Sequence, residues 1–198
     1  MTSKGAFDIL FATVGVLILS PLFLIITVVI FLYNGAPIFY IQKRIGQYGV
    51  SFDLIKFRTM VVNAEQRGSL TIGNRDSRVT KPGYYLRKYK LDELPQLFNI
   101  LKGDMSFVGP RPEVEKYVKR YTDRQRRVLS VKPGITDRAS IKYVDENELL
   151  AKSDNPESFY LKRIMPDKIE YNLRYIDSHD MMTDIKILLL TLSKIIKR

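Results

Sequence analysis

The sequence predicts an α+β protein, mainly α-helical, that is anchored in a membrane near its N-terminus. Three observations predict this: residues 9–33 form an uncharged apolar run, residues 38–60 contain two short β-prone runs, and helical patterns recur beyond residue 82. The chain has 198 residues, 45% of them hydrophobic, which suffices for one compact domain and an appendage. We therefore expect an anchor over residues 1–36 and a single domain over residues 37–198.

The apolar run is long enough to cross the hydrocarbon core of a bilayer as a helix, and it is longer than the apolar region of a typical signal peptide. Ser20 and Pro21 lie near its middle. Proline lacks an amide hydrogen and its ring crowds the carbonyl four residues earlier, so we expect a kink there, with Ser20 bonding a freed backbone group. A kinked spanning helix and a re-entrant helix–break–helix both fit, and hydropathy alone favours the spanning helix.

The formal net charge of +11 is carried entirely by the rest of the chain, because Lys4 and Asp8 are the only charged residues among the first 40. The positive-inside tendency places this basic part in the cytoplasm. Such a surface attracts polyanions: nucleic acid, anionic lipid head groups or phosphorylated substrates. The chain has no cysteine and a single histidine, His179, which excludes disulfides, thiolate metal sites and His-rich zinc sites. Any catalysis must therefore use carboxylates and basic residues.

Residues 38–60, "IFYIQKRIGQYGVSFDLIKFRTM", indicate a β-hairpin whose turn is "GQYG". We expect the basic residues of this hairpin to lie near one another; they are Lys43, Arg44, Lys56 and Arg58. Residues 67–81 are polar and contain glycine, which is typical of a loop. Pro82 favours the start of a short helix, which would carry Arg87 and Lys90 towards a pair of acids.

The acids are Asp92 and Glu93, in "YKLDELPQLFNILKGDMSFVGPRP". Asp92 suits the N-cap of a helix whose first turn contains Pro95, and Gly103 is expected to end that helix. An apolar stripe at helical spacing indicates core packing and consists of Leu94, Leu97, Phe98 and Leu101. The final helix is apolar over much of its circumference and suits either the core or a membrane surface. The two helices expected near the C-terminus cover residues 157–177 and 181–198.

A carboxylate at a helix N-terminus is stabilised as the anion, and an ionised aspartate can bind magnesium or attack phosphorus. Taken alone, Asp92 and Glu93 are better explained as a capping acid and an acid favoured by the helix dipole. Nearby cations could gather a phosphate-binding environment around them, or could simply form a basic surface that faces a membrane. Spacing alone leaves these alternatives open. The cations concerned are Arg87, Lys90, Arg111, Lys56 and Arg58.

A set of motifs supplies a resemblance. The ordered blocks "QKRIGQYG", "KFRTM", "LRKYKLDELPQLFNILKGDMSFVGPRP" and "VKPGIT", after an apolar segment with a central Ser-Pro, closely resemble the bacterial sugar transferase family of monotopic phosphoglycosyl transferases. The resemblance covers residues 4–136 and, more loosely, the rest. It implies an enzyme that moves a phospho-sugar from a UDP-sugar to a polyprenol phosphate, such as undecaprenyl phosphate, with release of UMP. Its catalytic domain, residues 37–198, would face the cytoplasm at the bacterial inner membrane and start the assembly of a surface glycan.

The resemblance also implies roles for single residues. Asp92 matches the nucleophile that forms a covalent phospho-sugar intermediate with the help of Mg²⁺, and Glu93 matches the partner carboxylate, a base or a second metal ligand. Arg87 matches an arginine that contacts phosphate, and Arg111 belongs to a Pro-Arg-Pro turn near the nucleotide. The complete set of expected phosphate or nucleotide contacts is Arg87, Pro110, Arg111, Pro112, Lys56 and Arg58.

In the family that the chain resembles, the Ser20-Pro21 break turns the N-terminal helix back, so the resemblance implies a re-entrant anchor in contact with membrane lipids. This replaces the preference for a spanning helix. The sequence departs from the family after "KPGIT", where "DRASIKYVDENELLAKSDNPES" replaces an "AQVNGR"-like segment, and at Asn172, where an aspartate is usual. We therefore name no sugar and exclude Asn172 from the site. His179 is expected to be a surface or capping residue.

Two rival functions remain at this level. A membrane-anchored nucleic-acid-binding module would need exposed aromatic residues among its basic ones, and would not depend on the acidic pair. A membrane scaffold without enzymatic activity would use Asp92 and Glu93 only for helix capping. The resemblance favours the enzyme and implies no nucleic acid partner.

Overall fold

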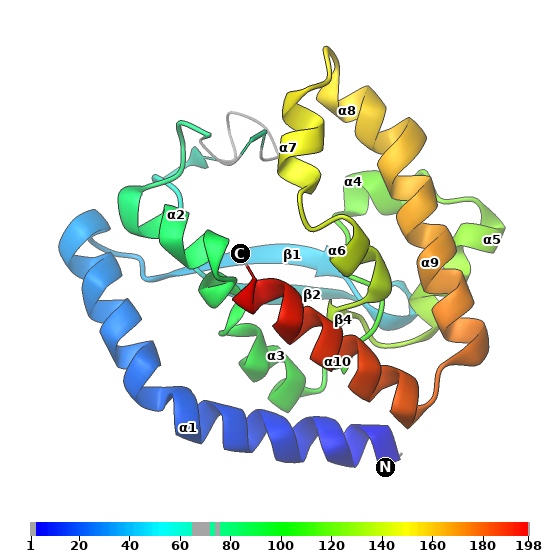
Figure 1. Cartoon of the computed structure of the whole chain (residues 1–198), viewed down its shortest axis with the longest axis horizontal. Coiled ribbons are helices and arrows are strands. Elements are labelled where there is room, and N and C mark those ends of the chain that lie inside the picture. Colours follow the sequence, from blue (N-terminus) through cyan, green and yellow to red (C-terminus); the bar gives the residue numbers. More distant parts are fainter. Residues whose placement is uncertain (1–2, 65–71, 74–75, 198) are drawn as a thin grey trace.

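The computed structural model describes residues 3–64, 72–73 and 76–197, and it confirms a mainly helical α+β fold (Figure 1). The longer helices are α1 (Ser3–Asn34), α2 (Lys81–Lys88), α3 (Gln96–Lys102), α9 (Met165–Ser178) and α10 (Met181–Ile196). The short helices are α4 (Glu115–Val118), α5 (Asp123–Arg126), α6 (Arg138–Lys142), α7 (Glu146–Ala151) and α8 (Pro156–Phe159). The strands are β1 (Phe39–Ile45), β2 (Ser51–Phe57), β3 (Ser106–Val108) and β4 (Gly134–Thr136).

Helix α1 contains the apolar run and continues through Pro21. By length and composition it could cross a membrane, with a mean hydropathy of 2.9 over its most apolar window. Ser20 Oγ donates a hydrogen bond to the carbonyl of Leu17 (2.8 Å), as expected for a serine beside a helical proline. Figure 1 shows the helix changing direction partway along its length. The interruption expected at Ser20-Pro21 therefore takes the form of a bend inside one continuous helix.

Both ends of α1 are fixed to the same domain. Near its start, the Lys4 ammonium donates to the carbonyl of Val108 (3.0 Å), and Asp8 accepts from the amide of Phe107 (3.1 Å). At its end, the Arg58 guanidinium donates to the carbonyls of Asn34 and Gly35, both at 2.7 Å. Between these points the buried side chains of α1 pack on the domain; they are Ala12, Ile26 and Ile30.

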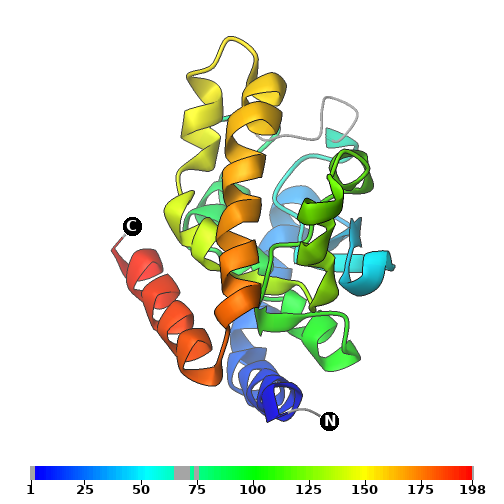
Figure 2. The same ribbon diagram turned by 90° about the vertical axis from the view of Figure 1, so that its right-hand side faces the viewer.

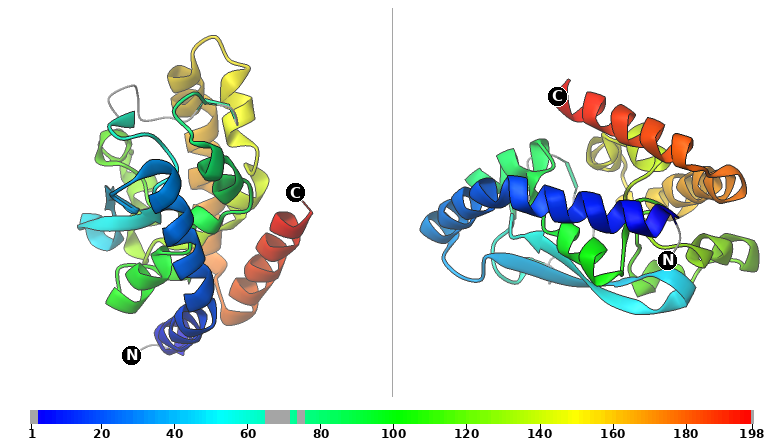
Figure 3. Two further views of the ribbon diagram at one scale, coloured as in Figure 1. Left: turned by 90° about the vertical axis from the view of Figure 1, so that its left-hand side faces the viewer. Right: turned by 90° about the horizontal axis from the view of Figure 1, so that it is seen from below.

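The predicted β-hairpin is present, with β1 and β2 antiparallel and Phe39 opposite Phe57. Its turn contains the predicted "GQYG", with Tyr48 and Gly49 at positive φ. The buried Asn99 side chain of α3 accepts from the amide of Ile55 (3.0 Å) and donates to the carbonyl of Asp53 (2.7 Å). These bonds tie β2 to α3. Figure 3 shows α3 between α1 and the hairpin, where the three elements share one apolar cluster.

The C-terminal helices follow the sequence prediction closely. Helix α8, a π-turn (Tyr160–Ile164) and α9 form one rod in place of the helix expected over 157–177, and α10 turns back beside it (Figure 2). The buried core of this part consists of Tyr117, Val128, Leu150, Tyr160, Ile164, Met165, Ile169 and Leu173. Helices α4 to α7 were not predicted, because each is too short to show helical periodicity. Of the loop predicted over 67–81, residues 67–71 and 74–75 lie outside the described residues. Residues 76–80 form no helix, and Val79 makes an isolated β-bridge with Met60 before α2 begins at Lys81.

Strands β3 and β4 form a short parallel pair that the sequence did not reveal. Two glycines allow their approach. A Cβ atom added at Gly134 would lie 2.1 Å from the Gly109 nitrogen, and one added at Gly109 would lie 2.4 Å from the Lys132 carbonyl oxygen. Any side chain here would push the strands apart. Because the Pro-Arg-Pro turn begins at Pro110, next to Gly109, the two glycines also determine where this turn lies.

We expect Gly134→Ala to destabilise the fold by about 1–3 kcal/mol, because backbone atoms must move to admit the added methyl group. The measurement is thermal unfolding of the detergent-solubilised chain. Gly15→Ala is the matched control, since a Cβ atom at this α1 position would lie 3.4 Å from a side-chain atom of Leu97, at ordinary contact distance. Equal melting temperatures for the two variants would contradict the close approach of β3 and β4.

Candidate active site

The acidic pair lies in a short 3₁₀ turn, Leu91–Glu93, between α2 and α3. The chain enters this turn through Lys90, whose φ of 58° is unusual for a residue with a side chain. The prediction that Asp92 caps α3 is wrong: Pro95 occupies the N-cap position, and α3 begins at Gln96. A 3₁₀ turn and an α-helical first turn favour similar residues, which explains the error. The separate turn buries both carboxylates.

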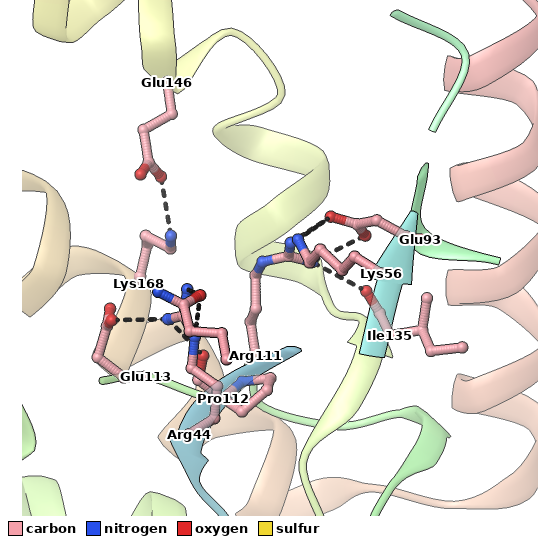
Figure 4. A network of polar contacts seen from close by, with 10 residues as sticks. Arg44, Lys56, Glu93, Arg111, Pro112, Glu113, Ile135, Glu146 and Lys168 are labelled. Atoms are coloured by element: carbon pink, nitrogen blue, oxygen red, sulfur yellow. Dashed lines mark hydrogen bonds and ion pairs between the residues drawn. The ribbon is translucent and has the colours of Figure 1, made fainter. Parts of the chain in front are cut away.

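Glu93 is held by two cations (Figure 4). The Arg111 guanidinium binds it with two prongs, Nη1 to Oε2 (3.1 Å) and Nη2 to Oε1, and the Lys56 ammonium donates to Oε1 (3.0 Å). Burial by itself would raise the pKa of Glu93, but Arg111, Lys56 and Lys90 hold that pKa well below its ordinary value. Glu93 is therefore an anion whose oxygens are both engaged by neighbouring cations.

Asp92 has the opposite environment. Its Oδ1 atom is buried, and no described group donates a hydrogen bond to it. Burial first, and then the negative charge of Glu93, raise the pKa of Asp92, against the opposing effect of Lys56, Lys90 and Arg87. Two adjacent carboxyl groups thus differ in pKa and in bonding. Asp92 is the member of the pair with an oxygen left to react.

Arg111 is positioned by the loop that carries it. Its amide donates to Asp137 Oδ2 (3.0 Å), and its guanidinium also donates to the carbonyl of Ile135 (3.3 Å). The other oxygen of Asp137 accepts from the amide of Ser140 at the start of α6. Pro110 and Pro112 hold this turn through their carbonyls, which accept from Gly134 N (3.0 Å) and Arg44 Nη1 (3.2 Å).

The predicted site residues do not all meet. Lys56, Arg87 and Arg111 line one cavity together with Asp92 and Glu93. The structure does not bring Arg58 to them, because its guanidinium bonds to the carbonyls at the end of α1. Pro110 and Pro112 support the turn behind Arg111. Burial lowers the pKa of Lys56 and of Arg87, and the two carboxylates oppose that shift.

The cavity has a volume of about 820 Å³ and combines three kinds of lining. Helices α1 and α10 contribute mainly apolar side chains. The α6–α7 segment contributes polar residues, including Tyr143, Asp145 and Asn147, beside the apolar Ile141 and Val144. The cations that line the cavity with the acidic pair are Lys56, Arg87, Lys88, Lys90, Arg111, Lys168 and Lys194. Such a lining suits a ligand that carries both phosphates and an apolar part.

Two groups of residues at the site were missed from the sequence. Lys168 of α9 pairs with Glu146 of α7 (2.8 Å), and both line the cavity. Arg44 Nη1 donates to Glu113 Oε1 (3.1 Å; Figure 4). The Tyr160 hydroxyl donates to the other oxygen of Glu113. Burial, and then Glu113, raise the pKa of Tyr160 well above its ordinary value. "QKRIGQYG" signalled Arg44, but no local pattern signalled partners far along the chain.

Two residues that were excluded from the site lie elsewhere. His179 Nδ1 donates a hydrogen bond to the carbonyl of Ile176 (3.0 Å), and the residue is exposed beyond the end of α9, so the expected surface or capping role agrees with the structure. Asn172 is buried on α9. Its Oδ1 atom has no hydrogen-bond partner among the described residues, and the structure offers no physical account of it.

A comparison with protein families matches residues 1–198 to the family described as "Bacterial sugar transferase". The "Uncharacterized sugar transferase EpsL" of Bacillus subtilis (strain 168) is 38% identical over 196 residues, which are 99% of this chain and 88% of that protein. The "UDP-N-acetylgalactosamine-undecaprenyl-phosphate N-acetylgalactosaminephosphotransferase" of Aeromonas hydrophila is 36% identical over 199 residues, or 98% of this chain.

A third relative is the "UDP-glucose:undecaprenyl-phosphate glucose-1-phosphate transferase" of Xanthomonas campestris pv. campestris. It is 34% identical over 204 residues, which are 99% of this chain. The chain spans 43% of the Aeromonas protein and 39% of the Xanthomonas protein, so these two relatives contain much that has no counterpart here. The site described above lies within the shared part.

We expect Lys90→Gly to stabilise the folded chain by about 1 kcal/mol, because glycine adopts the left-handed conformation without steric cost. Lys186→Gly is the control: this exposed lysine lies inside α10, where glycine should destabilise by about 1 kcal/mol. The measurement is thermal unfolding in detergent. If both variants lost stability equally, the backbone of Lys90 would not be strained.

Proposed function

Because the chain belongs to the bacterial sugar transferase family, we propose that it transfers a sugar phosphate from a UDP-sugar to a polyprenol phosphate, with release of UMP. Relatives of this chain bear names for this reaction with undecaprenyl phosphate as the acceptor. One observation carries the proposal: a buried carboxylate with a partnerless oxygen lies among cations in a cavity that adjoins the apolar helix α1. The product would start a surface glycan. The relatives differ in the sugar, which we leave open.

We propose a reaction in two steps. In the first, an Asp92 carboxylate oxygen attacks the phosphorus that bears the sugar, and the bond from that phosphorus to the bridging oxygen breaks, so that UMP leaves with this oxygen. In the second, an oxygen of the polyprenol phosphate attacks the same phosphorus, and the Asp92 carboxylate leaves. The product is a polyprenyl diphosphate sugar. A covalent intermediate divides one difficult transfer into two easier ones.

The geometry supports Asp92 rather than Glu93 as the nucleophile. Arg111 and Lys56 engage both oxygens of Glu93, so an attack by Glu93 would first have to break a buried ion pair. We therefore assign Glu93 the task of holding these two cations beside the reacting phosphorus. In this role it orders the charges that stabilise the phosphates as bonds break. The alternative role for Glu93, as a general base, fits less well with its lowered pKa.

The site also fits a magnesium ion. Among the described residues no group of three or more potential ligands occurs, but Mg²⁺ in phosphate-transfer sites often needs only one or two carboxylates besides water and substrate phosphates. Asp92 and Glu93 would hold the ion, Asp92 with the carboxylate oxygen that does not attack; Glu93 is less available, because cations engage both of its oxygens. When bound, Mg²⁺ would neutralise phosphate charge. Arg87 and Lys90, which line the same cavity, would help to orient the diphosphate.

We propose that α1 is re-entrant and that both of its ends lie on the cytoplasmic face of the inner membrane. A spanning helix separates its ends by about 30 Å of hydrocarbon. Here Lys4 and Asp8 at one end, and Asn34 at the other, all bond to the same domain. The outward face of α1 would lie in membrane lipid; its exposed apolar side chains include Leu10, Leu17, Ile18, Leu24, Ile25 and Leu32.

The first test of the mechanism uses the UDP-sugar and Mg²⁺ without any polyprenol phosphate. If Asp92 attacks first, UMP release should stop at about one equivalent per enzyme molecule. Asp92→Asn should release none, because an amide is a poor nucleophile of nearly the same shape. Asp53→Asn, at an exposed position of β2, is the control and should behave as the wild type. UMP that appears only after the acceptor is added would contradict the covalent step.

The second test concerns pH. Asp92 attacks as the anion, and its pKa is raised, so kcat/KM should fall as the pH is lowered through that raised pKa. The positive charge of Lys90 favours the ionised form of Asp92. Lys90→Gln should therefore raise the pKa of Asp92 further and shift the acid limb of the pH profile to higher pH. Lys186→Gln on α10 should leave the limb in place. If the acid limb of Lys90→Gln stayed at the same pH or moved to lower pH, this role of Lys90 would be disproved.

The third test concerns topology and uses the absence of cysteine from the chain. Ser3→Cys and Lys197→Cys place one thiol at each end, to be labelled with a membrane-impermeant maleimide. A re-entrant anchor predicts that both thiols react in inside-out vesicles and neither in intact spheroplasts. The unmodified chain gives the background. Labelling of Ser3→Cys in spheroplasts would show that α1 spans the membrane.

A further inference from the structure

The cavity of the acidic pair continues as an apolar groove between α1 and α10. Its walls include Phe7, Phe11 and Leu19 of α1, and Leu188, Leu192 and Ile195 of α10. Figure 3 shows that α10 runs beside the N-terminal half of α1, and the ion pair between Lys4 and Asp184 joins the two helices there. The groove is therefore bounded by the apolar anchor on one side and by the C-terminal helix on the other.

On each of the two helices the groove residues lie beside residues that are buried in the domain, and Leu19 and Leu188 also pack against the buried clusters. On α1, Ala12 is buried in the domain, whereas Phe7 and Phe11, four residues apart, line the groove. On α10, Asp184 and Ile187 are buried. The groove residues Leu188, Leu192 and Ile195 follow at helical spacing on the adjacent face. The groove is thus lined by a continuous stripe on each helix.

The floor of the groove leads directly to the reacting groups. Leu94 and Leu97 line the same cavity and follow Glu93 in the chain by one and four residues. Phe107 of β3 and Ile135 of β4 complete the apolar surface. The hydroxyl groups of Thr136 and Thr191 are 2.8 Å apart and fix α10 over this floor. Apolar surface and cationic surface therefore meet at Asp92.

We propose that this groove binds the isoprenoid chain of the acceptor, with the acceptor's phosphate at Asp92. The inference deepens the proposed function and rests on it. A polyprenol phosphate has one anionic end and one long apolar part, and the cavity offers cations around Asp92 and apolar side chains on α1 and α10. The UDP-sugar is polar throughout and would bind against the polar residues of the α6–α7 segment. The isoprenoid chain would reach the groove without leaving the membrane.

The main test compares two leucines on α10. Leu192 lines the groove, whereas Leu189 is absent from its lining, and the two side chains are similarly exposed, at 55% and 62%. Leu192→Gln should raise the KM for polyprenol phosphate about tenfold, the equivalent of losing one good apolar contact. The KM for the UDP-sugar and the acceptor-independent release of UMP should not change. Leu189→Gln should match the wild type in all three.

Equal effects of the two substitutions on the acceptor KM would contradict binding of the isoprenoid chain in the groove, because they would reflect membrane contact in general. An unchanged acceptor KM in Leu192→Gln would overturn it as well. The proposed function is judged separately on the wild type: transfer to polyprenol phosphate must occur with at least one UDP-sugar. If the wild-type enzyme made no such product, both the proposed function and the proposed role of the groove would be contradicted.

A second measurement does not depend on the variants. A polyprenyl phosphate with a diazirine in its first isoprene units, added to the wild-type protein in nanodiscs, should crosslink to peptides that contain residues 7–19 and 188–195. Unlabelled polyprenol phosphate should compete, and phosphatidylglycerol should not. Crosslinks confined to the outward face of α1, or equal competition by phosphatidylglycerol, would show that the groove does not select the acceptor.

Discussion

Glu93 and Arg111 lie 18 residues apart in the sequence, and their two-pronged ion pair joins the 3₁₀ turn to the loop after β3. The rest of the site depends on this contact. A buried ion pair costs desolvation on both sides, and it persists only where further bonds satisfy the remaining groups. Here Lys56 of the hairpin bonds to Glu93, and the Ile135 carbonyl of β4 and the carboxylate of Asp137, which follows β4, accept from Arg111. Three separate parts of the chain therefore meet at one carboxylate.

The same contact explains how two adjacent acids acquire different chemistry. Cations bound to Glu93 keep it ionised, and its charge in turn raises the pKa of Asp92. Asp92 keeps a buried oxygen that no described group engages. An attacking carboxylate must be desolvated and close to positive charge, and both conditions hold at Asp92. The site lies beside α1, which is bonded to the domain at both ends, so the position of the proposed nucleophile relative to the proposed membrane surface is fixed.

Much of this architecture could be predicted from local patterns. The apolar run, the hairpin around "GQYG", the helix that ends at Gly103 and the two C-terminal helices all have enough length or distinctive turn chemistry. Strands β3 and β4 could not be predicted, because three residues show no periodicity and their pairing depends on Gly109 and Gly134. The partners of Arg58, Lys168 and Glu113 lie far away in the chain. Motif resemblance located Asp92 and Arg111, but only the tertiary structure shows which oxygen is free.

The central claim is that Asp92, and not Glu93, carries the reacting oxygen. The most direct measurement is fragmentation mass spectrometry of a digest prepared after the enzyme has met a UDP-sugar that it uses, with Mg²⁺ and without the acceptor. The account predicts one added phospho-sugar, located by the fragment ions on Asp92. A phospho-sugar found on Glu93 or on another residue, or none on the protein while acceptor-dependent transfer proceeds, would contradict it.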